Sequence, residues 1–241
     1  MKILVVNDDS ISAPQLPGLV RWCRKLGDVT VIVPKYEQSG KSQSIELHKP
    51  FEIKKVQLAE DIEAYTIDSA PADCVRYAVF GLKQKYDLVI SGINRGYNMG
   101  RDIMYSGTAG GVFEAVSLGM KAVAISTGPE VYDRALENLD MVLEYFKEHK
   151  LMELCDLYNV NVVPDPKGIR ITRQGGHFYS DDFVHQGNDL YLPVGKCVYV
   201  NKQDLTLDTD CVMNGYISVM PMTIDRADPA VLQQLLPLNR N

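Results

Sequence analysis

The sequence predicts an α/β protein built on a doubly wound, mostly parallel sheet. Short apolar runs of the kind that form fully buried parallel strands recur at residues 2–6, 29–33, 88–90 and 122–126. Segments with helical periodicity separate these runs, and glycine, proline and polar residues stand at the junctions. This β-α-β alternation is typical of a parallel sheet that carries helices on its faces.

The elements of the first part follow from these rules in order. The strand at 2–6 precedes an amphipathic helix over 16–26 that ends at Gly27, and the strand at 29–33 closes at Pro34. The later elements are expected as strands within 45–56 and at 65–67, a helix over 69–82, a strand at 88–90, a helix over 106–118, a strand at 122–126 and a long helix over 132–146.

Beyond residue 150 the pattern changes to short β segments. We expect strands at 158–163, 169–173 and 216–222, with turns at 174–177 and 186–189 that indicate projecting hairpins. The helix over 229–236 carries large apolar residues with nothing local to bury them, so it is expected to dock on the body or on a partner subunit. We therefore divide the chain into an α/β core with the active site (1–150) and an extension (151–241) that holds the hairpin, a returning core strand and a C-terminal oligomerisation segment, in one compact unit.

Composition limits the classes of partner. The 241 residues are 46% hydrophobic and 23% charged, with a formal net charge of −6 and no basic block, which argues against binding to a nucleic-acid duplex. No apolar run approaches the length of about 18 residues that a membrane helix requires. The five cysteines lack the CxxC spacing of metal and redox sites. We expect a cytoplasmic protein with reduced thiols and no membrane contact.

One half of a phosphate site is expected after the strand at 88–90. A long polar loop with Asn94 and Asn98 follows it, and a helix then begins at three small residues, Ser106, Gly107 and Thr108. Ligands of open α/β sheets lie beyond the carboxyl ends of the strands, and free N–H groups at a helix start attract anions. The alternative is a surface loop with an ordinary Ser or Thr helix cap.

A metal site is expected after the first strand. Asp8 and Asp9 follow that strand directly, and in the turn beyond it both carboxylates can converge on one cation. The loop over 35–44 reaches the same end of the sheet, and the hydroxyl of Ser39 is a fair ligand for a hard metal. The alternatives are a helix cap for the aspartates and a flexible polar turn for the loop.

Other catalytic signatures are missing from the sequence. There is no GxSxG elbow, no HExxH and no GxGxxG after the first strand, so serine hydrolases, zinc proteases and dinucleotide oxidoreductases are disfavoured. The four histidines are dispersed, and structural or surface roles are expected for them. His177 is the exception to this expectation, because it follows two glycines in the hairpin region.

Together these motifs resemble the SurE family of metal-dependent survival-protein nucleotidases. The combination of NDD, SGINxGxNxG and YSGT in one register is highly specific, and matching blocks cover nearly the whole chain in the family's order. These blocks are Asn7–Asp9, Ser39–Gly40, Ser44–Ile45, Pro71–Val75, Ser91–Gly96 with Asn98 and Gly100, Tyr105–Thr108, Asn159–Asn161, Thr172–Gln174, and Gly215–Tyr216 with Ser218 and Pro221.

The resemblance implies roles for particular residues. A single divalent ion, Mn²⁺ or Mg²⁺, would be held by Asp8, Asp9, Ser39 and Asn94. The phosphate would be held by Ser106, Gly107 and Thr108, and the catalytic residues would be Asp8, Asp9 and Asn98. All four metal ligands are oxygen donors, as a hard cation requires.

The resemblance also implies a fold and an assembly. It predicts a Rossmann-like core, a protruding β-hairpin region and a C-terminal helix exchanged between the subunits of a homodimer or homotetramer. Ser10 is a departure, because the family usually has glycine there. If that position needs a positive φ, serine costs on the order of 1 kcal/mol. Ser69-Ala70 likewise replaces the family's Gly-Thr.

The implied activity is metal-dependent hydrolysis of nucleoside 5′-monophosphates, with 3′-monophosphates and other phosphomonoesters as further candidates. The main alternative is a non-catalytic nucleotide-binding paralogue whose site the departures have relaxed. A response-regulator receiver is disfavoured, because Ser91 and Ser126 stand at the strand ends where it needs a phospho-accepting aspartate and a lysine. A purely structural assembly subunit is disfavoured by the intact set of oxygen ligands.

Overall fold

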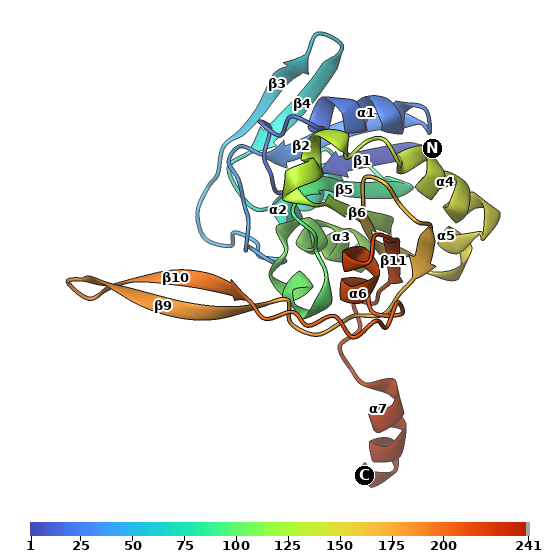
Figure 1. Cartoon of the computed structure of the whole chain (residues 1–241). Helices are drawn as coiled ribbons and strands as arrows, with labels where there is room; N and C mark the ends of the chain where they lie inside the picture. The colour runs from blue at the N-terminus through green and yellow to red at the C-terminus, as the bar shows by residue number, and fades with distance from the viewer. Residues whose placement is uncertain (240–241) are drawn as a thin grey trace.

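The computed structural model describes residues 1–239, and within them one nine-stranded sheet forms the centre of the molecule. Its strand order is β3-β4-β2-β1-β5-β6-β7-β11-β8, and two further strands, β9 and β10, form a separate hairpin (Figure 1). The strands are β1 (Lys2–Val6), β2 (Asp28–Pro34), β3 (Ile53–Ala59), β4 (Ile62–Ile67), β5 (Leu88–Arg95), β6 (Lys121–Thr127), β7 (Leu157–Val162), β8 (Ile169–Ile171), β9 (Tyr179–Gly187), β10 (Leu190–Cys197) and β11 (Ile217–Pro221).

Helices connect these strands. The α-helices are α1 (Leu16–Arg24), α2 (Pro71–Arg76), α3 (Gly107–Ser117), α4 (Leu139–Glu148), α5 (Leu151–Leu154), α6 (Asp208–Met213) and α7 (Pro229–Leu235). The π-helical and 3-10 segments are η1 (Tyr77–Gly81), η2 (Gly100–Tyr105), η3 (Pro129–Arg134) and η4 (Leu236–Leu238).

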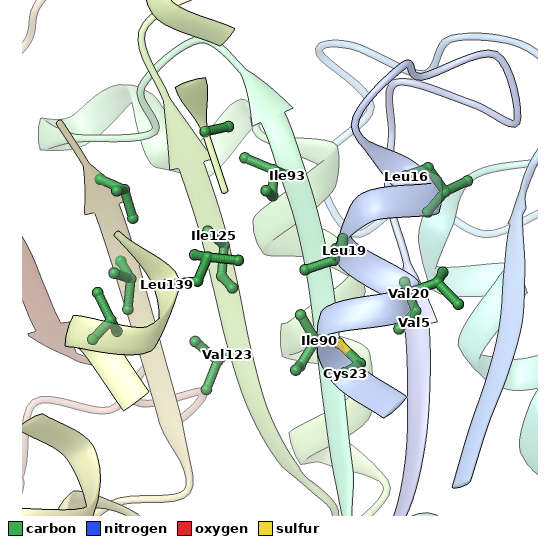
Figure 2. Packing of buried hydrophobic residues seen from close by; sticks show 14 of the residues in the cluster. Val5, Leu16, Leu19, Val20, Cys23, Ile90, Ile93, Val123, Ile125 and Leu139 are labelled. Carbon is green, nitrogen blue, oxygen red and sulfur yellow. The ribbon is translucent and has the colours of Figure 1, made fainter. Parts of the chain in front are cut away.

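The apolar strands bury both faces of the sheet, as their unbroken hydrophobic runs predict. Ile3 and Val5 of β1 belong to a core shared with α1 and α4, in which Leu19 of α1 lies over the sheet (Figure 2). The alternate residues Leu4 and Val6 belong to a second core with α2 and α3 on the opposite face. Successive side chains of a strand point to opposite faces, so each helix layer receives every second residue.

The predicted α/β class is confirmed, but the sheet is mixed. Six of the eight neighbouring strand pairs are parallel. The other two, β3–β4 and β7–β11, are antiparallel. Residues 45–52, expected to contribute strand, are irregular, and the chain instead makes a hairpin of β3 and β4 at one edge.

The prediction of one long helix over 132–146 was wrong. A 3-10 segment, η3, ends at Arg134, and α4 begins only at Leu139. The side-chain amide of Asn138 donates to the backbone oxygens of Val163 (2.9 Å) and Pro164 (2.7 Å), which holds the chain in a non-helical conformation. Such side-chain bonds compete with helix propagation. The helix expected over 69–82 likewise changes from α2 to the π-helical η1, and α6 was not predicted.

The topological switch point of the sheet lies between β1 and β5. From β1 the chain moves to β2 and β4 on one side, then returns to β5 on the other side of β1. Connections that depart in opposite directions leave a crevice at the carboxyl ends of these two strands, which is the usual ligand position in open α/β sheets.

Two elements extend away from the sheet. The hairpin of β9 and β10 turns at Asn188 and Asp189, both at positive φ (50° and 60°), which confirms the turn expected over 186–189. Hairpin and α7 both project from the body, and α7 has no buried residue (Figure 1). None of the helices within residues 1–239 is both long and apolar enough to span a bilayer.

Candidate metal and phosphate site

A buried carboxylate joins the end of β1 to the start of α3. Asp8 is only 3% exposed, and its Oδ1 accepts a hydrogen bond from the hydroxyl of Thr108. The backbone oxygen of Asp8 accepts a second bond, 2.8 Å long, from the amide of Gln38 in the loop after β2. Three segments that are far apart in the sequence therefore meet at this one residue.

Burial makes the charge of Asp8 costly. The pKa of its carboxyl is raised to about 6: removal from water is the main cause, the hydrogen bond from Thr108 acts in the opposite direction, and the neighbouring Asp9 adds a smaller increase. Burial also raises the pKa of Asp9, whose Oδ2 accepts a 2.8 Å bond from the amide of Arg95. Glu37 raises the pKa of Asp9 as well. A cation between the two aspartates would offset these costs.

The start of α3 is packed directly against Asp8. The hydroxyl of Ser106 caps the helix by accepting a 3.1 Å bond from the amide of Ala109. At Gly107 a Cβ would lie 2.9 Å from both Cβ and Oδ2 of Asp8, so only glycine lets these segments approach so closely. The positive end of the α3 dipole thus lies beside the aspartates, where an anion and a cation could bind side by side.

Ser39 lies in the loop after β2, and Asn94 lies in the last residues of β5, the strand that pairs with β1. Ser39 follows Gln38, which contacts Asp8, and its hydroxyl donates to Oε1 of Glu37 over 2.8 Å. The side-chain nitrogen of Asn94 donates to the backbone oxygen of Gly96 over 2.7 Å. This bond orients the amide so that its Oδ1 points away from Gly96.

Asn98 lies in a network of asparagines at the ends of β6 and β7. Its side-chain nitrogen donates to Oγ of Ser126 over 2.8 Å, and its backbone oxygen accepts bonds of 2.8 Å from Asn159 and Asn161. Asn161 also accepts from the amide of Asn98 over 2.9 Å. We assigned no role to these partners from the sequence, although two asparagines alternating within an apolar strand were a visible signal. They fix the loop that carries Asn98.

The donor chemistry of the site fits a hard divalent ion. Asp8, Asp9, Ser39 and Asn94 offer carboxylate, hydroxyl and amide oxygens, and Oδ1 of the fully buried Asn7 has no hydrogen-bond partner among the described residues. Across residues 1–239 no group of three or more His, Cys, Asp or Glu side chains is arranged to hold a metal. An ion here would therefore depend on the neutral oxygen donors as well as on the two aspartates.

Ser10 has a positive φ, the conformation that would explain why the family usually has glycine at this position. Its φ is +72°, a region in which non-glycine residues are strained. The side-chain nitrogen of Asn7 donates to the backbone oxygen of Ser10 over 2.9 Å and holds the turn in place. The turn that carries both aspartates therefore accommodates serine at a cost on the order of 1 kcal/mol.

Comparison with known proteins identifies the family. The family model described as "Survival protein SurE" matches residues 3–181. This chain belongs to the SurE family. It is 35% identical to the 5′-nucleotidase SurE of Thermosipho melanesiensis, over 98% of this chain and 96% of that protein. It is 37% identical to the 5′-nucleotidase SurE of Thermoanaerobacter sp., over 93% of each chain.

A solved SurE structure supports the architecture. The crystal structure of the SurE protein from Aquifex aeolicus superposes with a TM-score of 0.79 at 29% sequence identity and covers 99% of both chains. The resemblance to SurE that the sequence motifs carry is thus confirmed, and so is the combination of a mostly parallel sheet with a β-hairpin.

The raised pKa of Asp8 predicts how stability depends on pH. The folded pKa of about 6 exceeds the ordinary value of 3.8, so the metal-free folded state binds more protons between these values. Its free energy of unfolding should therefore fall by up to about 3 kcal/mol as the pH rises from 4 to 7. The Asp8→Asn variant should lose this contribution and show a smaller fall, as measured by urea denaturation in chelator.

A matched variant provides the control for this measurement. Asp28→Asn changes an exposed aspartate at the opposite end of the sheet and should keep the pH profile of the parent chain. Identical pH profiles for Asp8→Asn and the parent would show that Asp8 is not the costly buried group.

Proposed function

We propose that this SurE chain is a metal-dependent phosphatase that hydrolyses nucleoside 5′-monophosphates, with 3′-monophosphates and other phosphomonoesters as further substrates. The observation that carries the proposal is the buried Asp8 carboxylate bonded to Thr108, because it places a group that needs a cation beside a helix start suited to phosphate. The relatives that match nearly the full chain are named 5′-nucleotidases.

The metal would be one divalent ion, Mn²⁺ or Mg²⁺, held by Asp8, Asp9, Ser39 and Asn94. Such an ion, when bound, polarises a phosphoryl oxygen and lowers the pKa of bound water. The protein's own part is to supply charge and position. The two aspartates provide the negative charge, and the amide of Arg95 fixes Asp9 in place.

The phosphate would be held by the helix start at Ser106, Gly107 and Thr108. Backbone N–H groups and the α3 dipole favour the negative charge that phosphoryl oxygens carry in the transition state. Because Gly107 has no side chain, this helix start packs directly against Asp8 and the backbone oxygen of Gln38. The cap made by Ser106 keeps the first turn of α3 rigid.

Proton handling and alignment would fall to Asp9 and Asn98. Burial raises the pKa of Asp9, and a carboxylate with a raised pKa is a better proton acceptor for an attacking water. Asn98 would contact the phosphate from the loop before α3. Its bonds to Ser126, Asn159 and Asn161 restrict that loop to one position, as catalytic alignment requires.

A second candidate function is nucleotide binding without turnover. The strained φ of Ser10 favours it, because that residue shapes the turn that carries Asp8 and Asp9. A small displacement of the turn would leave phosphate binding at α3 intact while misplacing the metal ligands. Metal-dependent turnover separates this candidate from the enzyme.

We further propose a homodimer or homotetramer of cytoplasmic subunits with a Rossmann-like core, in which the C-terminal helix is exchanged between subunits. Four large apolar residues of α7 and η4 are 44–51% exposed: Val231, Leu232, Leu235 and Leu236. Apolar side chains of the hairpin, including Phe183 and Tyr191, are also exposed. Such surfaces are typical of subunit interfaces.

Hydrolysis is tested by phosphate release from a panel of nucleoside monophosphates with Mn²⁺, Mg²⁺ or chelator. The parent chain should release phosphate only with metal, and Asp8→Asn should lower kcat by at least about 100-fold, because it removes a charged metal ligand. The Asp28→Asn control should match the parent. Nucleotide binding without release under any condition would favour the non-catalytic paralogue.

Assembly is tested by sedimentation of a charged variant. Placing aspartate at two exposed positions of α7, Leu232→Asp with Leu235→Asp, should convert a dimer or tetramer to a smaller species, since an interface there would have to bury both charges. Leu154→Asp, at a 76% exposed site on α5, should leave the assembly unchanged. A monomeric parent chain would contradict the proposal.

A further inference from the structure

A cavity of about 720 Å³ lies on the face of the sheet that α1 and α4 cover. Its floor is formed by Ile90 of β5 and by Val123 and Ile125 of β6, and these side chains lie between the two helices in Figure 2. Trp22 of α1 and Phe146 of α4 belong to its walls. Sites for small molecules are mostly apolar and have volumes of roughly 300–1,000 Å³, so this cavity has the size and lining of a binding site.

Contacts within the protein hold the cavity open. At one end α1 touches the segment before α4, because a Cβ at Gly18 would collide with Cδ1 of Leu136. Farther along, the two helices are joined by a hydrogen bond, in which Nε1 of Trp22 donates to Oδ1 of Asp140 over 2.7 Å. The spacing of the helices is therefore fixed on both sides of the gap, and a ligand would enter a preformed space.

Lysines gather where the cavity reaches the carboxyl ends of the two helices. Lys25 follows α1, Lys147 lies in the last turn of α4, and Lys150 follows that helix. All three are exposed, so their methylene stems can lie along the apolar wall while the ammonium groups stay in water. Glu153 is a lining carboxylate at the same end, and Lys25 lies 3.5 Å from Asp140. Within residues 1–239 the other two lysines form no salt bridge.

An apolar interior with cations at its mouth fits an elongated molecule with one anionic end. An alkyl chain would leave water for the floor and walls, which is favourable. A carboxylate at the end of the chain would stay at the mouth, where the lysines attract it and would repel a cationic head. From Leu139 to Lys147 the wall made by α4 is roughly 12 Å long, which favours a chain over a compact ring.

We propose that the space between α1 and α4 is a binding site for a medium-chain fatty carboxylate. The chain lies over Val123 and Ile125, and the carboxylate lies at Lys147 and Lys150. Leu88, which also lines the cavity, is the first residue of β5, so the site opens at the edge of the sheet opposite to the aspartates. The inference is therefore independent of the proposed function.

Titration calorimetry with decanoate tests the site. One decanoate should bind per chain and should change the fluorescence of Trp22, because this only tryptophan of the chain lines the cavity. Decyltrimethylammonium, which has the same chain and a positive head, should bind at least about ten-fold more weakly. Absence of decanoate binding, an unchanged fluorescence of Trp22, or equal affinities for the two ligands would overturn the proposal.

Two variants test the head and the chain separately. Lys147→Glu with Lys150→Glu reverses two exposed charges and should raise the Kd for decanoate about ten-fold, whereas Lys196→Glu with Lys202→Glu, the same change at and beyond β10, should not. Val123→Phe should weaken binding by filling part of the floor. Equal affinities in the two lysine variants, or an unchanged Kd in Val123→Phe, would contradict the placement of the ligand.

Discussion

The hydrogen bond between Thr108 and the buried Asp8 carboxylate is the constraint on which the rest of the site depends. It joins the switch point of the sheet to the start of α3, and it can form only because Gly107 leaves no side chain between them. The bond does not fully compensate for burial, since the pKa of Asp8 remains raised to about 6. We propose that a fold that keeps so costly a group at this crevice binds a cation there.

The sequence predicted the parts of this arrangement that are local. Unbroken apolar runs identified the parallel strands, because buried strands need no alternation, and polar residues after β1 and β5 marked the crevice. The sequence suggested that a positive φ at position 10 would make serine energetically less favourable than glycine, and Ser10 does have a positive φ. The turn at Asn188 and Asp189 was likewise readable, since these residue types tolerate left-handed conformations.

What the sequence did not predict depends on long-range contacts. The break between η3 and α4 follows from bonds of Asn138 to a segment 25 residues away. The hydrophobic periodicity of the sequence carries no information about such a contact. The network of Asn98 with Asn159 and Asn161 joins the loop after β5 to a strand more than 60 residues away. Asp102 of η2 likewise accepts bonds from the amides of Phe178 and Tyr179, which are 76 and 77 residues away, and so anchors the base of the hairpin.

The central claim is that Asp8 and Asp9 form a site for one divalent ion, and titration calorimetry of Mn²⁺ into metal-free protein tests it most directly. One ion per chain should bind to the parent, with a proton released as the pH approaches 6, and binding should be lost in Asp8→Asn and in Asp9→Asn. Unchanged affinity and stoichiometry in both variants would contradict the claim.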